Sequence, residues 1–194
     1  LTRGFKQTNL ERASVDNYWN PVWGEYNRVR NHYNEMAVNL TNEDHVQLTL
    51  RFRVFDDGIG FRYEYTVPTV DSLLITDELT TFRFHRDGTS WSIPASAETY
   101  ELLYQQQPIS EVETANTPFT FKTADGVYGS IHEAALYDFP EMTLKQIGHY
   151  TLKAELAPWP DGIKARKGNH FTTSWRTVQI APEAVGLINS SLIL

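Results

Sequence analysis

Residues 132–136 read His-Glu-Ala-Ala-Leu and begin like the metal-binding helix of a zinc protease. In that helix a second histidine follows the first by one turn, so that both imidazoles face one metal ion. Position 136 is a leucine in this chain. The segment therefore lacks the residue that makes the motif specific, and we exclude a zinc protease site.

Glu133 can still do chemistry if residues 127–133 form a strand. Side chains alternate between the two faces of a strand, so Val127, Gly129, Ile131 and Glu133 would share one face. The strand would then end in a carboxylate beside apolar neighbours. Two interpretations remain open: a structural, salt-bridged glutamate, or a carboxylate that holds a cation or a substrate.

Residues 31–35, Asn-His-Tyr-Asn-Glu, bring hydrogen-bonding groups next to an aromatic ring. On a loop these groups would suit sugar recognition, in which rings stack on the sugar and amides or carboxylates bond its hydroxyls. The alternative is an ordered turn whose side chains satisfy backbone groups. Most of the five tryptophans are expected in the core, and Trp159, between two prolines, is the best candidate for an exposed ring.

Other classes of chemistry lack their residues. The chain has no cysteine, which excludes thiol catalysis, disulfides and Cys-zinc sites. It has neither a glycine-rich phosphate loop nor a Gly-x-Ser-x-Gly motif. A net charge of −7 argues against nucleic acid and anionic membranes as partners, and no apolar run approaches the ~18–20 residues of a spanning helix.

The elements that must position these residues are strands. Residues 48–54 and 59–65 alternate apolar with polar residues around Asp-Asp-Gly, which predicts a hairpin whose arginines face away from its apolar residues. Residues 98–107 allow a short helix, and the last four residues read as part of a strand. Further period-2 runs occur at residues 36–40, 82–84, 119–121, 127–133, 150–156 and 178–180.

Strands separated by short polar turns along 194 residues predict an all-β fold, a sandwich of mainly antiparallel strands forming a single domain over residues 1–194. The first residue is Leu1 rather than methionine. We expect the chain to be a piece of a longer protein.

Five ordered blocks together resemble the N-terminal domain of glycoside hydrolase family 97. The first reads Trp-Asn-Pro-Val-Trp-Gly-Glu and the fourth Ile-His-Glu-Ala-Ala-Leu-Tyr-Asp-Phe-Pro. The blocks span nearly the whole chain, at residues 19–25, 30–35, 52–64, 131–140 and 174–178.

The resemblance implies a three-part enzyme with an N-terminal β-super-sandwich, a central (β/α)8 barrel and a small C-terminal β domain. Its members are exo-acting α-glucosidases or α-galactosidases, typically periplasmic or otherwise secreted, that act on α-linked oligosaccharides and bind calcium. By position in the fourth block, Glu133 resembles the calcium ligand that the N-terminal domain supplies. The barrel would supply the other ligands and the catalytic groups.

From the resemblance we expect a leader and the first strands to precede this sequence in a whole family member, and the barrel and the C-terminal domain to follow it. An opened sheet edge is expected where the early strands belong, and self-association or strand exchange would cover it. Glycoside cleavage requires two carboxyl groups flanking the bond, and the sequence offers no convincing pair. The isolated chain is therefore expected to be inactive and to bind calcium weakly, because calcium takes about 6–8 oxygen ligands.

Two other classes remain as alternatives. A stand-alone carbohydrate-binding module would present exposed aromatic rings in a row, whereas a structural domain would need no functional Glu133. A mutarotase-like enzyme is a third interpretation, but fold analogy alone does not supply its catalytic residues.

Overall fold

A computed structural model of the chain describes residues 3–193. Within these residues lie sixteen strands and two single-turn helices, and every strand pairing is antiparallel. The strands form a ten-stranded, a four-stranded and a two-stranded sheet. The predicted all-β sandwich is confirmed.

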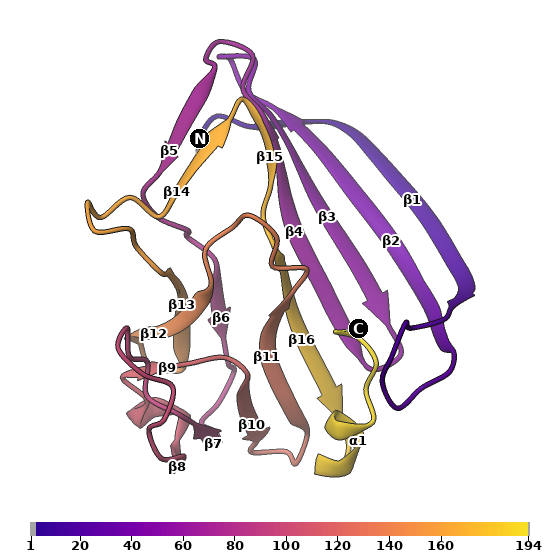
Figure 1. The fold of residues 1–194 in the computed structure, drawn as a ribbon, viewed down its shortest axis with the longest axis vertical. Helices are drawn as coiled ribbons and strands as arrows, with labels where there is room; N and C mark the ends of the chain where they lie inside the picture. The colour runs from indigo at the N-terminus through magenta and orange to yellow at the C-terminus, as the bar shows by residue number, and fades with distance from the viewer. Residues whose placement is uncertain (1–2, 194) are drawn as a thin grey trace.

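The large sheet begins with a long, twisted hairpin array that rises away from the rest of the molecule (Figure 1). Along the sheet the strands are β1 (Lys6–Trp19), β2 (Val29–Thr41), β3 (Gln47–Phe55), β4 (Gly58–Thr66), β16 (Trp175–Ala181), β11 (Tyr128–Ala134), β10 (Phe119–Thr123), β7 (Gly88–Ser92) and β8 (Gln105–Pro108), with β15 (His170–Thr172) also paired to β4.

The smaller sheet covers the β10–β11 part of the large one and closes the core. Its strands are, in order, β6 (Thr81–Arg83), β13 (Thr151–Leu156), β12 (Met142–Gly148) and β9 (Thr114–Ala115). The largest buried apolar side chains come from both sheets and the 3-10 turn η1 (Ile109–Glu111), and include Phe119, Ile131, Met142, Leu144, Leu152, Leu156 and Ile109. The remaining elements are the β5 (Ser72–Ile75) and β14 (Ala165–Gly168) pair and the helix α1 (Ala184–Ile188). Residues 3–193 contain no helix with the length and apolarity to cross a membrane.

The predicted hairpin is confirmed as β3–β4, and its glycine, Gly58, is required by the neighbouring strand β16. The reversal is made by Asp56 and Asp57, and Phe55 pairs with Gly58 as the first residue of β4. A Cβ at Gly58 would lie 2.3 Å from the carbonyl oxygen of Val178 on β16. Close approach of the neighbouring strand therefore requires glycine here.

Three local predictions fail, and one strand was not predicted. Residues 31–35 lie inside β2 rather than on a loop, because their pairing with β1 and β3 outweighs their polarity. Residues 98–107 form irregular chain followed by β8, not a helix. Residues 191–193 follow helix α1 and are not a strand, while Leu194 lies outside the described residues. Finally, the whole of β1 carried too little hydrophobic alternation to be recognised.

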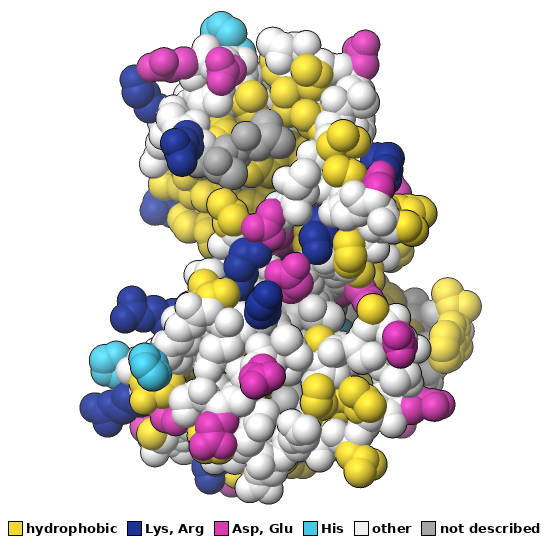
Figure 2. Space-filling model, turned by 90° about the vertical axis from the view of Figure 1, so that its left-hand side faces the viewer, with side chains coloured by type: hydrophobic (Ala, Val, Ile, Leu, Met, Phe, Trp, Pro, Cys, Tyr) yellow, Lys and Arg dark blue, Asp and Glu magenta, His cyan; other side chains and the backbone are white. Residues whose placement is uncertain are grey.

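The two faces of the β2–β4 array differ in chemistry, as the alternation predicted. On one face Arg51 bridges Glu35 and Glu64, at 2.6 and 2.7 Å, and Arg53 pairs with Glu35 at 2.8 Å. The opposite face is apolar and turns toward β5 and β14. Figure 2 shows hydrophobic side chains gathered in the upper part of this side, above a band of acidic and basic side chains.

Within residues 3–193, no strand pairs with the outer edge of β1. The edge is 14 residues long, and nearly all its side chains are exposed. Self-association through this edge stays a prediction.

Candidate functional site

Glu133 lies near the end of β11, where the large sheet meets β12. Its Oε1 accepts a hydrogen bond from the Met142 amide at 2.9 Å. Its Oε2 accepts one from Ser174 Oγ at 3.2 Å and one from Arg176 Nη1 at 2.6 Å. Since the side chain is only 8% exposed, the carboxylate is fixed in one orientation by three donors.

Arg176 makes the shortest of these hydrogen bonds. Strand β16 runs beside β11, and Arg176 pairs directly with Glu133 across the two strands. The guanidinium is fully buried and also forms a bidentate pair with Glu78, from Nε at 2.8 Å and Nη2 at 2.6 Å. Glu78 lies on the segment between β5 and β6. One buried cation thus joins two buried carboxylates from distant parts of the chain.

Burial and charge act in opposite directions on this triad. Burial raises the pKa of Glu133, and the hydrogen bonds from Met142 and Arg176 only partly oppose it, since Arg176 is shared with Glu78. Burial alone would lower the pKa of Arg176, but the two carboxylates outweigh it and raise that pKa. Arg176 therefore remains charged, and it donates to the carboxyl group at position 133.

A pocket of about 400 Å³ opens beside Glu133, between β11, β12 and the segment around Tyr100. Asn116 lines it, and the buried Oδ1 of that residue has no hydrogen-bond partner. Glu141 also lines it and accepts a hydrogen bond from Tyr100, which raises the pKa of that phenol to about 12. The pocket therefore gathers the kind of oxygen atoms that a hard cation binds.

The loop that follows Glu133 is held in an unusual backbone conformation. Ala135 and Asp138 have φ angles of 51° and 45°, in the left-handed region that residues with a side chain rarely adopt. The Tyr137 amide donates to the Ala135 carbonyl at 2.9 Å, and the Tyr137 ring is 82% exposed. Such strain is concentrated at functional sites in proteins, and here Ala135 and Leu136 of the same loop line the pocket beside Glu133.

The described residues contain no group of three or more histidine, aspartate or glutamate side chains placed to hold a metal ion. Glu133 as a calcium ligand thus stays a prediction that needs ligands from elsewhere. Of the two interpretations left open by the sequence, the structural one is directly visible in the pair with Arg176. It does not exclude the other, because a carboxylate offers about four acceptor positions and Glu133 uses three.

Of the other residues singled out in the sequence, only His132 lies at this pocket within the described residues. Its Nδ1 lies 3.0 Å from Oγ1 of Thr117, which also lines the pocket. Burial lowers the pKa of His132. His32 lies in β2, 3.6 Å from a carboxylate oxygen of Asp56. The structure does not bring residues 31–35 to Glu133.

The expectation that most tryptophans are buried is wrong. Only Trp175 is buried, between the guanidinium groups of Arg53 and Arg62, each 4.7 Å from its ring. Trp159 is 60% exposed, as expected of it, but Trp23 is more exposed at 88%. The exposure of each tryptophan depends on whether the tertiary structure places it in a loop or in the core. The number of tryptophans in the sequence does not reveal this.

Sequence reasoning also missed most of the partners of Glu133. Ser174 and Arg176 occur in the fifth block, but nothing in their spacing shows that β16 lies beside β11. Glu78 precedes Arg176 by 98 positions. Only the sheet pairing, together with the buried position of Arg176, identifies the triad.

Comparisons with known proteins agree with this architecture. The family model described as "Glycosyl-hydrolase 97 N-terminal" matches residues 1–194. A glycoside hydrolase family 97 enzyme from Pseudoalteromonas sp. strain K8, solved in complex with acarbose, is 39% identical, with a TM-score of 0.94 over 98% of this chain. A variant of a family 97 enzyme from the same strain, solved in complex with panose, matches with the same identity, TM-score and coverage.

The chain spans 30% of the length of these Pseudoalteromonas enzymes. A crystal structure of a β-arabinopyranosidase shares the fold, with a TM-score of 0.83 at 20% identity, over 92% of this chain and 32% of that one. The family model and the 39% identity together establish the relationship. The chain belongs to glycoside hydrolase family 97 and corresponds to the N-terminal domain of its members.

Proposed function

We propose that this domain packs on a catalytic (β/α)8 barrel of the same polypeptide and completes the calcium site of an exo-acting α-glycosidase through Glu133. The observation that carries the proposal is the fixed Glu133 carboxylate at a pocket that is also lined by Asn116, whose buried Oδ1 has no hydrogen-bond partner. In this proposal the parent enzyme is an α-glucosidase or α-galactosidase that is periplasmic or otherwise secreted.

The donor set at the pocket fits calcium in kind but not in number. Calcium takes about 6–8 oxygen ligands, which include carboxylates and amide carbonyls. Glu133 retains one acceptor position, Asn116 Oδ1 is unpartnered, and Glu141 lines the same pocket. The other ligands would come from the barrel. When bound, the ion would supply positive charge for an oxygen that becomes negative during bond cleavage.

The residues of this chain orient the ligand rather than react. Arg176 and Ser174 hold Oε2, and the Met142 amide holds Oε1, so that the remaining acceptor position on Oε1 points in a constant direction. Burial excludes water from the ion pair and strengthens it. A ligand that is already oriented loses little conformational freedom when the ion binds.

The catalytic carboxyl groups belong to the barrel in this proposal. A saccharide substrate is supported by the acarbose and panose complexes of the Pseudoalteromonas enzymes. The alternative function is a stand-alone carbohydrate-binding or structural module, which the exposed rings of Trp23 and Trp159 favour. In that case Glu133 would act only in the ion pair with Arg176.

Substituting Glu133→Gln in the full-length enzyme tests the proposal. We expect calcium affinity, measured by calorimetry, to fall by roughly tenfold or more, because a charged ligand is replaced by a neutral one. Activity on 4-nitrophenyl α-glycosides should fall with it and recover in part at high calcium. Glu64→Gln is the matched control, since Glu64 is also ion-paired but lies on the β2–β4 array. Wild-type kinetics together with an unchanged calcium titration in Glu133→Gln would refute the role.

A further inference from the structure

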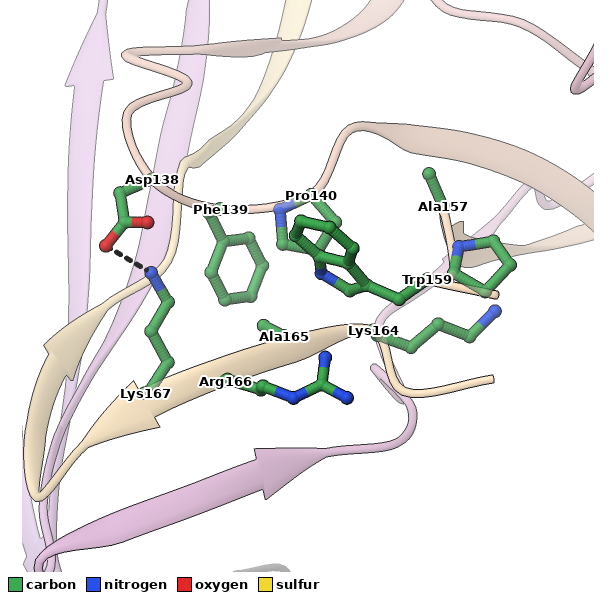
Figure 3. A pocket seen from close by; sticks show the side chains of 10 residues that line it. Asp138, Phe139, Pro140, Ala157, Trp159, Lys164, Ala165, Arg166 and Lys167 are labelled. Carbon is green, nitrogen blue, oxygen red and sulfur yellow. Dashed lines mark ion pairs between the residues drawn. The ribbon is translucent and has the colours of Figure 1, made fainter. Parts of the chain in front are cut away.

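A second pocket lies between the loop that precedes β12, the loop between β13 and β14, and strand β14 itself. Its volume is about 410 Å³, within the range of sites that hold small molecules. In Figure 3 the rings of Phe139 and Trp159 lie above β14, and Arg166 and Lys167 extend from that strand. Glu133 does not line this pocket.

The backbone of Trp159 is held in place, and the residue is 60% exposed. The residues on either side are prolines, whose rings fix the backbone φ angle. The Trp159 amide donates to the Ile163 carbonyl, and the Gly162 amide donates to the Trp159 carbonyl, both at 2.8 Å. The loop therefore presents a flat apolar surface at little cost in conformational entropy upon binding.

Each cation that lines this pocket is already paired with a carboxylate, although only Asp138 among those carboxylates lines the pocket itself. Lys167 Nζ lies 2.9 Å from the Asp138 carboxylate, and Arg166 pairs with Asp161. Lys164 Nζ lies 3.1 Å from Glu155 and donates to the Leu156 carbonyl at 2.7 Å. Each cation thus has a carboxylate partner, and the balanced charge favours a neutral ligand over a phosphate or another anion.

A flat aromatic ring next to fixed donors and acceptors matches the two sides of a pyranose. The C–H face of a pyranose is apolar and lies flat against an indole, whereas its rim of hydroxyl groups requires charged or amide partners. Asp138 provides an acceptor that is almost fully exposed, at 98% of its side chain, and Arg166 provides half-exposed donors. Both lie at the pocket that Trp159 lines.

We propose that this pocket binds a neutral pyranose unit of an oligosaccharide, with Trp159 stacked on the sugar face and with Asp138 and Arg166 bonded to its hydroxyls. The site gives the domain a saccharide contact of its own. It does not depend on calcium or on Glu133.

Calorimetric titration of the 194-residue chain with maltose tests the pocket. Maltose should bind, and Trp159→Ala should weaken the affinity by roughly tenfold, the loss of one aromatic stacking contact. Trp159→Phe should restore most of the affinity, since it keeps an aromatic face. Asp138→Asn should weaken binding several-fold, because a neutral amide oxygen is a weaker acceptor than a carboxylate. Trp23→Ala removes a more exposed ring outside the pocket and should leave binding unchanged.

The proposal is overturned if maltose does not bind at millimolar concentrations, or if Trp159→Ala and Asp138→Asn both bind like the wild type. Binding of inorganic phosphate in place of maltose would overturn it as well, in favour of an anion site. Glu133→Gln should leave maltose binding unchanged. Failure of the calcium role and failure of this pocket are therefore separate results.

Discussion

At the level of single residues, the structure shows why one glutamate fits two interpretations that the sequence could not combine. Glu133 is a structural ion-pair residue, because Arg176 and Ser174 hold its Oε2. The same contacts leave acceptor capacity on Oε1 beside an open pocket. Orientation by a buried cation is thus compatible with use of the carboxylate as a ligand, and in our proposal it is the reason for the arrangement.

Replacing the buried guanidinium should be costly. In Arg176→Met, Glu78 and Glu133 lose their common partner while remaining buried, so the free energy of unfolding in urea should fall by about 3–5 kcal/mol. Adding Glu78→Gln should recover part of this loss, because the two positions are coupled. Arg30→Met, which breaks an exposed pair with Asp16, should change stability little. A fully stable Arg176→Met variant would show that the triad does not hold the sheets together.

At the level of elements, the β2–β4 array is stabilised by charge on one face and only partly covered on the other. Burial alone would raise the pKa values of Glu35 and Glu64, but the arginines beside them outweigh burial and lower both. A glutamate with a lowered pKa stabilises the fold above its ordinary value of 4.5 and loses that contribution as the pH falls through the lowered pKa. Glu133 acts in the opposite sense, because its pKa is raised.

The stability of the array should therefore decrease at acidic pH. We expect the free energy of unfolding of the wild type to fall below about pH 4.5, the ordinary glutamate pKa. In the double variant Glu35→Gln and Glu64→Gln this part of the pH dependence should be reduced, since the groups that gain protons are gone. Urea unfolding curves across this pH range measure the difference. Parallel pH profiles of the two proteins would contradict the assignment.

At the level of the whole molecule, the domain has a closed core and a candidate ligand, Glu133, but its described residues offer too few side chains for a complete calcium site. The described residues hold no cluster of three or more potential metal-binding side chains, and the chain covers 30% of the Pseudoalteromonas enzymes that it resembles. In our proposal the site at Glu133 is completed only when the barrel lies against it.

The isolated chain should therefore lack the activity of its parent. We expect no release of 4-nitrophenol from α-glucosides or α-galactosides, because the two carboxyl groups that flank the bond lie elsewhere. Calcium should bind more weakly than micromolar, since most of the hydration shell would remain unreplaced. The full-length enzyme is the positive control in both assays. Hydrolysis by the isolated chain, or tight calcium binding to it, would place a complete site within these 194 residues.

Much of the fold was accessible from short-range patterns. The β3–β4 hairpin follows from period-2 alternation around Asp-Asp-Gly, and the arginines of β3 and β4 lie opposite its apolar residues because side chains alternate. Strand β1 and residues 31–35 were not recognised, because both faces of β1 are exposed and pairing with neighbouring strands overrides local polarity. Helix α1 contains five residues, too few for a periodic signal.

The sequence by itself determined the all-β class, the family and Glu133 as the residue to examine, because alternation and ordered motifs are local properties of the chain. Only the tertiary structure decided the partners of that residue. Arg176 meets Glu133 through strand pairing, and in the buried interior it also meets Glu78, which is 98 positions away in the sequence. Hydrogen bonds between strands depend on long-range register. An unpaired buried charge is costly, so charged residues that are buried together must form pairs even when they are distant in the sequence.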